Sequence, residues 1–224
     1  MSVVVAFLSQ KGGVGKSTLA RSLGVVAARV GLRVLIADLD PQQRTLMRWL
    51  KTRTDLDLKP HVRVEAFVDP SDVLDAGRDA DLIILDLPGH VSDVVTSIAR
   101  NADLIVQPTS PSVDDLHPAV LVFQALERVG ISRDHLVFAL CRVLGEKEAD
   151  ATRSYLERQN YAVARGCVSE RLGYRDALNL GRSLTESRQS NLNNAAHLLL
   201  LDILDRALTR SMSAKQAMRR KVRG

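Results

Sequence analysis

The residues that most clearly suggest a chemical function form a glycine-rich run near the start of the chain, QKGGVGKST at residues 10–18. Its three glycines lack the Cβ atoms that would stop the backbone from curling around an anion, so successive N–H groups can point at phosphate oxygens. Lys16 adds a cation for the β- and γ-phosphates, and the hydroxyl of Ser17 can bind a magnesium ion. The residues expected to contact a nucleotide are Gly12, Gly13, Val14, Gly15, Lys16, Ser17 and Thr18.

Acidic side chains follow two of the apolar runs. The run at residues 33–37 leads into Asp38 and Asp40, and the run that starts at residue 82 ends at Asp86. Because ligands of open α/β sheets bind at the carboxyl ends of the strands, these acids should face the same crevice as the glycine-rich run. An acid at the end of an apolar strand commonly holds magnesium, usually through water, and this role is expected of Asp86.

Short apolar runs alternate with helical patterns along most of the chain, which is typical of βαβ units. We therefore predict an α/β fold: a single domain with a mostly parallel, twisted sheet flanked by helices. Strands are expected at residues 3–8, 33–37, 62–68, 81–86, 104–106, 135–143 and 163–168. Helices are expected after the glycine-rich run, from residue 42, from residue 70, and at 112–128, 146–158 and 191–208, with a proline-rich loop at 107–111.

The glycine-rich run departs from the common phosphate-loop pattern G-x-x-x-x-G-K-[ST], because Gln10 replaces the first glycine and Lys11 follows it. Two lysines so close would repel each other unless both faced concentrated negative charge, so both are expected to converge on one triphosphate. In this form the run resembles the deviant Walker A box of the ParA/MinD family of ATPases, and most of all the small plasmid-partition ParA proteins. The DLDPQ box at 38–42, the strand that ends at Asp86 and the QPTSP run at 107–111 carry the same resemblance.

The resemblance implies a P-loop fold and roles for individual residues. Lys11 would reach across a dimer interface to the partner's nucleotide, whereas Lys16 and Ser17 would serve the phosphates and magnesium of their own subunit. Asp40 would position the attacking water, and it joins Ser17 and Asp86 in the set expected near the metal. The expected catalytic residues are therefore Lys11, Lys16 and Asp40.

The sequence supports a more limited prediction for each of three other residues. Arg142 lies at the end of the 135–143 strand, where the family often places residues around the nucleotide base, and the alternative is a plain surface arginine. Cys141 and Cys167 belong to no C-x-x-C pair, so two buried thiols are expected rather than a metal or redox site.

The formal net charge of +5 is concentrated at the end of the 224-residue chain. Residues 211–224, which we call the basic tail, hold five basic and no acidic side chains, leaving 26 basic and 26 acidic residues in the rest. We therefore divide the chain into an ATPase domain at 1–210 and the basic tail. Such a tail is either a solvated chain end or a contact for nucleic acid or anionic lipid. The residues expected to bind DNA are Lys215, Arg219, Arg220, Lys221 and Arg223.

The composition, 46% apolar and 25% charged, is that of an ordinary globular domain. No basic leader precedes the first apolar run, and no stretch approaches the roughly 20 apolar residues of a membrane span. The sequence therefore predicts a cytoplasmic, nucleoid-associated protein.

Together these observations predict a slow ATPase that acts as a switch. ATP and Mg²⁺ would close a homodimer that binds DNA without sequence preference, and a ParB-like activating or adaptor protein would stimulate hydrolysis and release, moving a plasmid, chromosome region or other cargo. The alternatives are a MinD-like positioning ATPase on the membrane and a metabolic P-loop phosphotransferase. The first normally ends in an amphipathic helix with bulky apolar residues, whereas this tail offers Met212, Met218 and Val222 among its basic residues. The second needs an acceptor pocket and a lid, for which the sequence shows no dedicated insertion.

Overall fold

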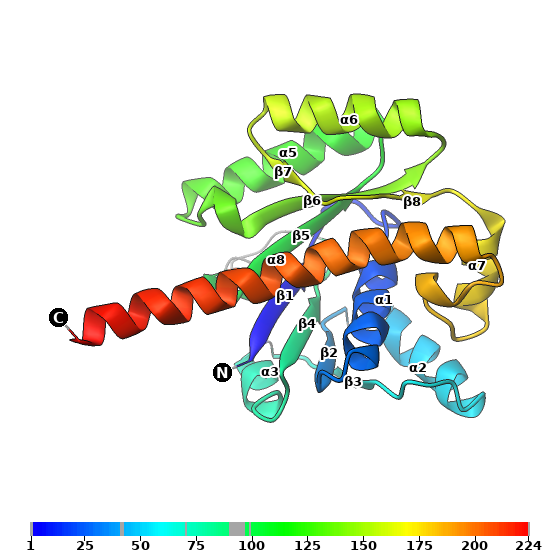
Figure 1. The fold of residues 1–224 in the computed structure, drawn as a ribbon, viewed down its shortest axis with the longest axis horizontal. Helices are drawn as coiled ribbons and strands as arrows, with labels where there is room; N and C mark the ends of the chain where they lie inside the picture. Colours follow the sequence, from blue (N-terminus) through cyan, green and yellow to red (C-terminus); the bar gives the residue numbers. More distant parts are fainter. Residues whose placement is uncertain (1, 41–42, 70, 90–96, 99, 224) are drawn as a thin grey trace.

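The structure, a computed structural model, describes residues 2–40, 43–69, 71–89, 97–98 and 100–223. These residues form an eight-stranded sheet with the order β3-β2-β4-β1-β5-β6-β7, and β8 also pairs with β6. Each strand pair in it is parallel, so the predicted α/β fold is confirmed (Figure 1). The strands are β1 Val3–Phe7, β2 Val34–Asp38, β3 Arg63–Ala66, β4 Leu82–Asp86, β5 Leu104–Thr109, β6 Leu136–Val143, β7 Ala162–Val163 and β8 Val168–Ser169.

Helices cover both faces of the sheet. One face packs against α1, α2, α7 and α8 through a core that includes Leu23 and Ile203, and the other packs against α3, α5 and α6 through a core that includes Val73 and Phe123. Strands β1, β2, β4 and β5 are consequently buried at every residue, which explains their continuous apolar runs. The helices are α1 Lys16–Arg29, α2 Thr45–Asp55, α3 Ser71–Ala76, α5 Val113–Arg128, α6 Glu146–Arg158, α7 Leu172–Asn179 and α8 Ser190–Arg223, with 3₁₀ turns η1 Arg133–His135 and η2 Leu184–Glu186.

The strand register brings the predicted acids to one place. Phe7, the last residue of β1, pairs with Asp86 at the end of β4, and Asp38 at the end of β2 pairs with the same Asp86. The glycine-rich run leaves β1 directly after Phe7 and Leu8. The carboxyl edge of these three strands therefore collects the phosphate loop and the acidic residues, as expected for an open parallel sheet.

The prediction of a loop at 107–111 is wrong for its first three residues. Gln107, Pro108 and Thr109 belong to β5 and pair with β6. A proline is unusual in an interior strand because it has no N–H to donate. Here β1 pairs with β5 only as far as Val106, so Pro108 lies beyond the end of that neighbour and its missing N–H breaks no bond to β1.

The later part of the chain also differs from expectation. The single strand predicted at 163–168 is two short strands, β7 and β8, separated by Gly166 in a left-handed conformation (φ +74°). A Cβ at Gly166 would lie 3.1 Å from the backbone nitrogen of Leu199, so the chain turns there against α8. Helix α7 was not predicted, because its eight residues give only a short helical pattern.

Helix α8 does not end at Leu208 as predicted. It runs for 34 residues to Arg223, a length of about 50 Å, and thus includes nearly all of the basic tail. Ser211 is still buried, whereas Met212, Ser213 and Lys215 are exposed, so the helix is mostly exposed beyond Ser211. Figure 1 shows this C-terminal end projecting beyond the sheet. Among the described helices, none is both long and apolar enough to cross a bilayer.

Candidate nucleotide-binding site

The glycine-rich run forms a compact loop between β1 and α1. Gly13 and Gly15 have φ angles of +77° and +113°, in the region that residues with a Cβ rarely adopt. The carbonyl of Gly15 accepts the first helical hydrogen bond from the amide of Leu19 at 2.9 Å, so α1 begins directly at the loop. The free N–H groups at the start of α1 therefore face the site, which suits an anion.

Lys16, Ser17 and Asp86 meet at the bottom of this loop. The ammonium of Lys16 lies 3.5 Å from the carbonyl oxygen of Ser9, and burial lowers its pKa against the opposing effect of Asp86 and Asp40. Asp86 is almost completely buried, and this burial raises its pKa to about 7 although the Ser17 hydroxyl donates a hydrogen bond to it. A carboxylate so placed lacks the solvation it needs when ionised, and a cation beside it would supply the missing stabilisation.

The donor set fits a magnesium ion held together with a nucleotide. Oδ1 of Asp86 is buried and has no hydrogen-bond partner in the described part of the chain. Within that part, no group of three or more His, Cys, Asp or Glu side chains could hold a metal by itself. Mg²⁺ commonly binds through one or two protein groups plus phosphate oxygens and water, which matches Asp86 and Ser17 beside the phosphate loop.

Asp38 and Asp40 occupy different environments although they are two residues apart. Asp38 is buried, and its carboxylate accepts backbone hydrogen bonds from Asp40 and from Leu46 at the start of α2. Asp40 is partly exposed, accepts a hydrogen bond from the amide of Gln43 at 3.0 Å, and acts electrostatically on Lys16 and Asp86. Asp40 is therefore the acid nearer to solvent at the phosphate site, while the rest of the DLDPQ box, Pro41 and Gln42, lies outside the described residues.

Lys11 stands on the rim of the site, not in its interior. Its side chain is 50% exposed and forms an ion pair with Asp115 in the first turn of α5, which is 8% exposed. The hydroxyl of Ser110 also donates a hydrogen bond to Asp115, at 2.5 Å. Asp115 was not predicted from the sequence, where the only local indication was an acidic pair in the first turn of a predicted helix.

Arg142 lies beside a cavity of about 400 Å³ that adjoins the phosphate loop. It donates to Glu170 at 2.8 Å, and Arg175 lies 3.6 Å from the same carboxylate. The cavity also contacts Gly13 and Gly15 of the loop. Glu170 and Arg175 were not predicted, because they lie on the short β8–α7 segment that gave little pattern. The cavity is large enough to take part of a nucleotide base or ribose next to bound phosphates.

The predicted DNA-binding residues all lie on the last three turns of α8 and apart from the phosphate loop in sequence. Lys215 is exposed and lines a cavity of about 530 Å³ with Ser2, Val4 and Asp103 near the amino end of the sheet. The other four continue the same helix, but their side chains lie outside the described part of the structure: Arg219, Arg220, Lys221 and Arg223.

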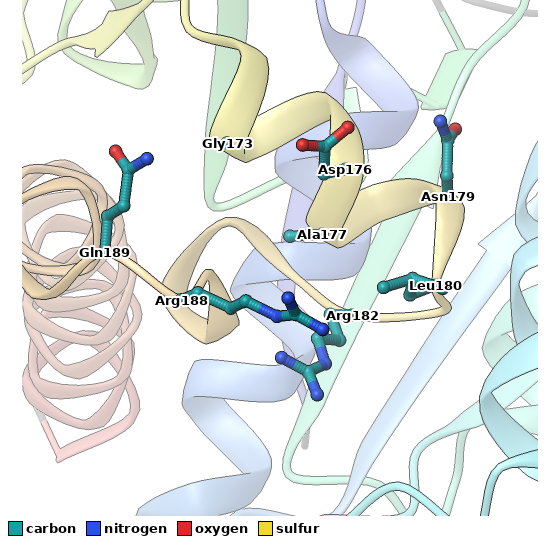
Figure 2. Close-up of a pocket in the computed structure, with 8 residues that line it drawn as sticks. All are labelled: Gly173, Asp176, Ala177, Asn179, Leu180, Arg182, Arg188 and Gln189. Carbon is teal, nitrogen blue, oxygen red and sulfur yellow. The ribbon is translucent and has the colours of Figure 1, made fainter.

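A further cavity of about 390 Å³ lies between α7 and the start of α8 (Figure 2). Its lining includes Arg182, Arg188 and Asp176 and none of the predicted phosphate or metal residues. Figure 2 shows the Arg182 and Arg188 side chains extending into the same region below α7. The cavity is therefore separate from the nucleotide site.

Comparison with known proteins agrees with this geometry. The family model of the CobQ/CobB/MinD/ParA nucleotide-binding domain matches residues 5–220. The chain belongs to this family. As a member of the ParA/MinD group, it has the deviant loop and the parallel sheet predicted from its sequence, and the family resemblance is confirmed.

Individual relatives are more distant. The chain is 32% identical over 111 residues to the sporulation initiation inhibitor protein Soj of Bacillus subtilis, covering 46% of this chain and 43% of that protein. It is 32% identical over 116 residues to the protein ParA of Rhizobium radiobacter, covering 50% of each. The chain thus matches about half the length of these curated relatives. A septum site-determining protein MinD from Pyrococcus horikoshii, solved with Mg-ADP, superposes with a TM-score of 0.70 at 18% identity, covering 89% of this chain and 95% of the other, which shows the shared fold.

Proposed function

We propose that this protein is an ATPase of the partition and positioning type, in which ATP closes a homodimer and hydrolysis opens it. The observation that carries the proposal is the different setting of two lysines in one loop. Lys16 lies inside the site and interacts with Asp86, whereas Lys11 stands half exposed on the rim and pairs with Asp115. A phosphate loop that served one subunit alone would need only the inner lysine. The outer lysine is therefore assigned to the nucleotide of a facing subunit.

The other site residues fit the same cycle. The N–H groups at the start of α1 and the ammonium of Lys16 would bind the phosphates, and Ser17 and Asp86 would hold Mg²⁺. When bound, this ion supplies positive charge against the charge that develops on the transferred phosphoryl group. Asp40 would orient the attacking water, and Arg142 with Glu170 would border the base or ribose. These roles rest on the placement of each side chain at one sheet edge.

The ATP-bound dimer would bind duplex DNA without sequence preference through the basic end of α8. One helix end offers few phosphate contacts, whereas the two ends of a dimer engage one duplex with a raised effective concentration. Binding would therefore depend on nucleotide without any change within α8. A role in partition is supported by the relatives, which include a ParA protein and a chromosome-partitioning ATPase. Nucleoid association and release by a ParB-like activating partner belong to the same proposal.

Co-sedimentation with plasmid DNA and with anionic liposomes, each with and without ATP, tests this function. The test variant replaces the four terminal basic residues with glutamine, because a truncation after Arg210 would also remove the buried Ser211: Arg219→Gln, Arg220→Gln, Lys221→Gln and Arg223→Gln. The matched control removes four exposed charges elsewhere: Lys51→Gln, Lys59→Gln, Arg63→Gln and Arg78→Gln.

We expect ATP-dependent DNA binding. The logarithm of the association constant should fall with the logarithm of salt concentration at a slope of roughly −3 to −5. The slope should flatten in the test variant and stay near the parent value in the control. A protein that ignores DNA at low salt with ATP present, but sediments with anionic liposomes, would instead be a membrane-positioning ATPase. A protein that stays monomeric and passes phosphate to a small acceptor would be a phosphotransferase.

A further inference from the structure

Two cations stabilise the carboxylate of Asp115 beside the candidate nucleotide site. Lys11 pairs with it directly. Arg142 acts on it electrostatically from the neighbouring strand β6. Thr109, the last residue of β5, pairs with Leu140, two residues before Arg142, and Ser110, the next residue after Thr109, donates to Asp115. Burial alone would raise the pKa of Asp115, but Lys11, Ser110 and Arg142 together hold it below its usual value.

Asp115 cannot lose its cation without a large cost. Only 8% of its side chain is exposed, so solvent cannot replace Lys11 as a source of stabilisation. A buried charge left without its partner is strongly destabilising, and one hydroxyl from Ser110 does not offset this. If Lys11 leaves its own subunit to reach a facing nucleotide, another positive group must take its place at Asp115.

The backbone conformation at Arg142 is consistent with a role as this second cation. It lies at an irregularity in the pairing of β6 with β8, between Cys141 and Val143, and its φ of +59° is in the left-handed region. Both neighbours are buried, whereas the Arg142 side chain is 54% exposed and lines the cavity that also contacts Gly13 and Gly15 of the loop. Non-glycine residues in this conformation are strained and often have a functional reason for it.

The current partner of Arg142 can release it. Arg142 donates to Glu170 at 2.8 Å, and Glu170 is 36% exposed and lies 3.6 Å from Arg175 as well. If Arg142 moves, Glu170 keeps one cation and partial hydration, so the loss there is the small one of an exposed ion pair. Asp115, which is far more buried, would gain more from Arg142 than Glu170 would lose.

We propose that Arg142 is a positioning residue that replaces Lys11 at Asp115 when Lys11 crosses to the partner's nucleotide. The inference rests on the proposed function, since it requires the ATP-dependent dimer. In the exchange, Lys11 leaves Asp115, Arg142 moves from Glu170 to Asp115, and Arg175 stays with Glu170. Each carboxylate then keeps a positive neighbour, and Lys11 is released without leaving a buried charge unpaired.

The dissociation constant of the dimer tests this exchange. It is measured by light scattering with a slowly hydrolysed ATP analogue, at concentrations that saturate each variant. Arg142→Gln should weaken the dimer by about tenfold or more, and Arg142→Lys, which keeps the charge, by less than about threefold. Arg33→Gln is the matched control, because Arg33 is 66% exposed and pairs with Asp81 away from the site. Thermal melts establish that each variant is folded.

A second substitution separates this role from contact with the base. Asp115→Asn, added to Arg142→Gln, removes the charge that needs a cation and should restore the dimer to within about threefold of the parent. If Arg142 served only the nucleotide base, Asp115→Asn would bring no recovery, and the inference would be overturned. It would also be overturned if Arg142→Gln alone dimerised like the parent. A parent that stayed monomeric with the analogue would overturn the proposed function and this inference together, whereas the other two outcomes overturn the inference alone.

Discussion

The buried carboxylate of Asp38 accepts a hydrogen bond from the backbone amide of Leu46 at 3.2 Å and thereby caps the first turn of α2. Its other oxygen accepts from the amide of Asp40, also at 3.2 Å. One side chain thus fixes both the start of α2 and the backbone that carries Asp40. The two acids of the DLDPQ box therefore have different tasks, with Asp38 supporting the structure and Asp40 assigned to the chemistry.

This division predicts different stabilities for two alanine variants. Asp38→Ala should lower the melting temperature by about 2–8 °C, because loss of a helix cap costs about 1–2 kcal/mol. Asp40→Ala should lower it by no more than about 2 °C, because Asp40 is partly exposed. Circular dichroism melts without nucleotide measure both, and equal losses would contradict the assignment.

Asp40 should matter to hydrolysis more than to binding. If it orients the attacking water, Asp40→Ala should bind ATP like the parent but release phosphate on the order of 10²–10⁴ times more slowly. The ATP-bound dimer should then accumulate. Phosphate release and nucleotide affinity are measured on the same preparation, and normal turnover would move the catalytic role to another acid.

Most of the fold was predictable because apolar strands buried on both faces leave continuous runs in the sequence, as in β1 and β4. The glycine-rich loop between β1 and α1 was predictable because its glycines and lysines lie within residues 11–16. The partner of Lys11 was not, since Asp115 lies 104 positions later in the chain and meets it only through the parallel pairing of β1 with β5.

The errors have local causes. Pro108 indicated a loop, but a proline can stay in a strand where the neighbouring strand has already ended. The end of α8 was placed at Leu208 because the apolar spacing fades there, although the helix continues without that support. Backbone geometry such as the bulge at Arg142 depends on strand pairing and leaves no pattern in a single sequence.

The two lysines of the loop should give separable defects. Lys16→Ala should lose both ATP and ADP binding, because Lys16 is assigned to the phosphates of its own subunit. Lys11→Ala should keep the monomer's affinity for ADP but fail to form the ATP dimer. Titration with a fluorescent ADP and sizing by light scattering with an ATP analogue distinguish them. A Lys11→Ala protein that dimerised as well as the parent would place this lysine in its own subunit's site.

The ion pair between Arg53 and Glu186 should make the free energy of unfolding depend on pH. Arg53 is buried and donates to Glu186 at 2.8 and 3.2 Å. Burial alone would raise the pKa of Glu186, but Arg53 and the amide of Ser183 lower it below the usual 4.5. A group whose pKa is lowered by folding stabilises the protein above its unfolded pKa, and this contribution is lost as pH falls through the folded pKa.

Glu186→Gln should therefore lower the melting temperature by about 6–12 °C at pH 7, since it leaves Arg53 buried without its counter-charge. The difference from the parent should shrink as the pH falls below 4.5. Glu65→Gln is the matched control, because Glu65 forms an exposed ion pair with Arg63, and it should change the melting temperature little at any pH. A constant difference across pH would show that the charge of Glu186 is not what stabilises the fold.

Gly181 should be far less replaceable than another glycine with a similar backbone. Gly181 and Gly31 have φ angles of +69° and +88°, so alanine is strained at both by about 1–2 kcal/mol. A Cβ at Gly31 would meet none of the described residues within 4 Å, whereas one at Gly181 would lie 2.7 Å from the backbone nitrogen of Arg53. Backbone atoms of a packed helix cannot move aside cheaply, and the carbonyl of Gly181 also accepts a hydrogen bond from Arg53 at 3.1 Å.

Gly31→Ala should therefore lower the melting temperature by about 2–6 °C, and Gly181→Ala by at least about 5 °C more. Because both variants share the backbone strain, their difference isolates the contact between Gly181 and α2. Thermal melts and urea unfolding measure it, and Gly181→Ala combined with Glu186→Gln should cost less than the sum of the two, because each disturbs the same Arg53. Equal losses for the two glycines would mean that α2 and the segment before η2 can separate without cost.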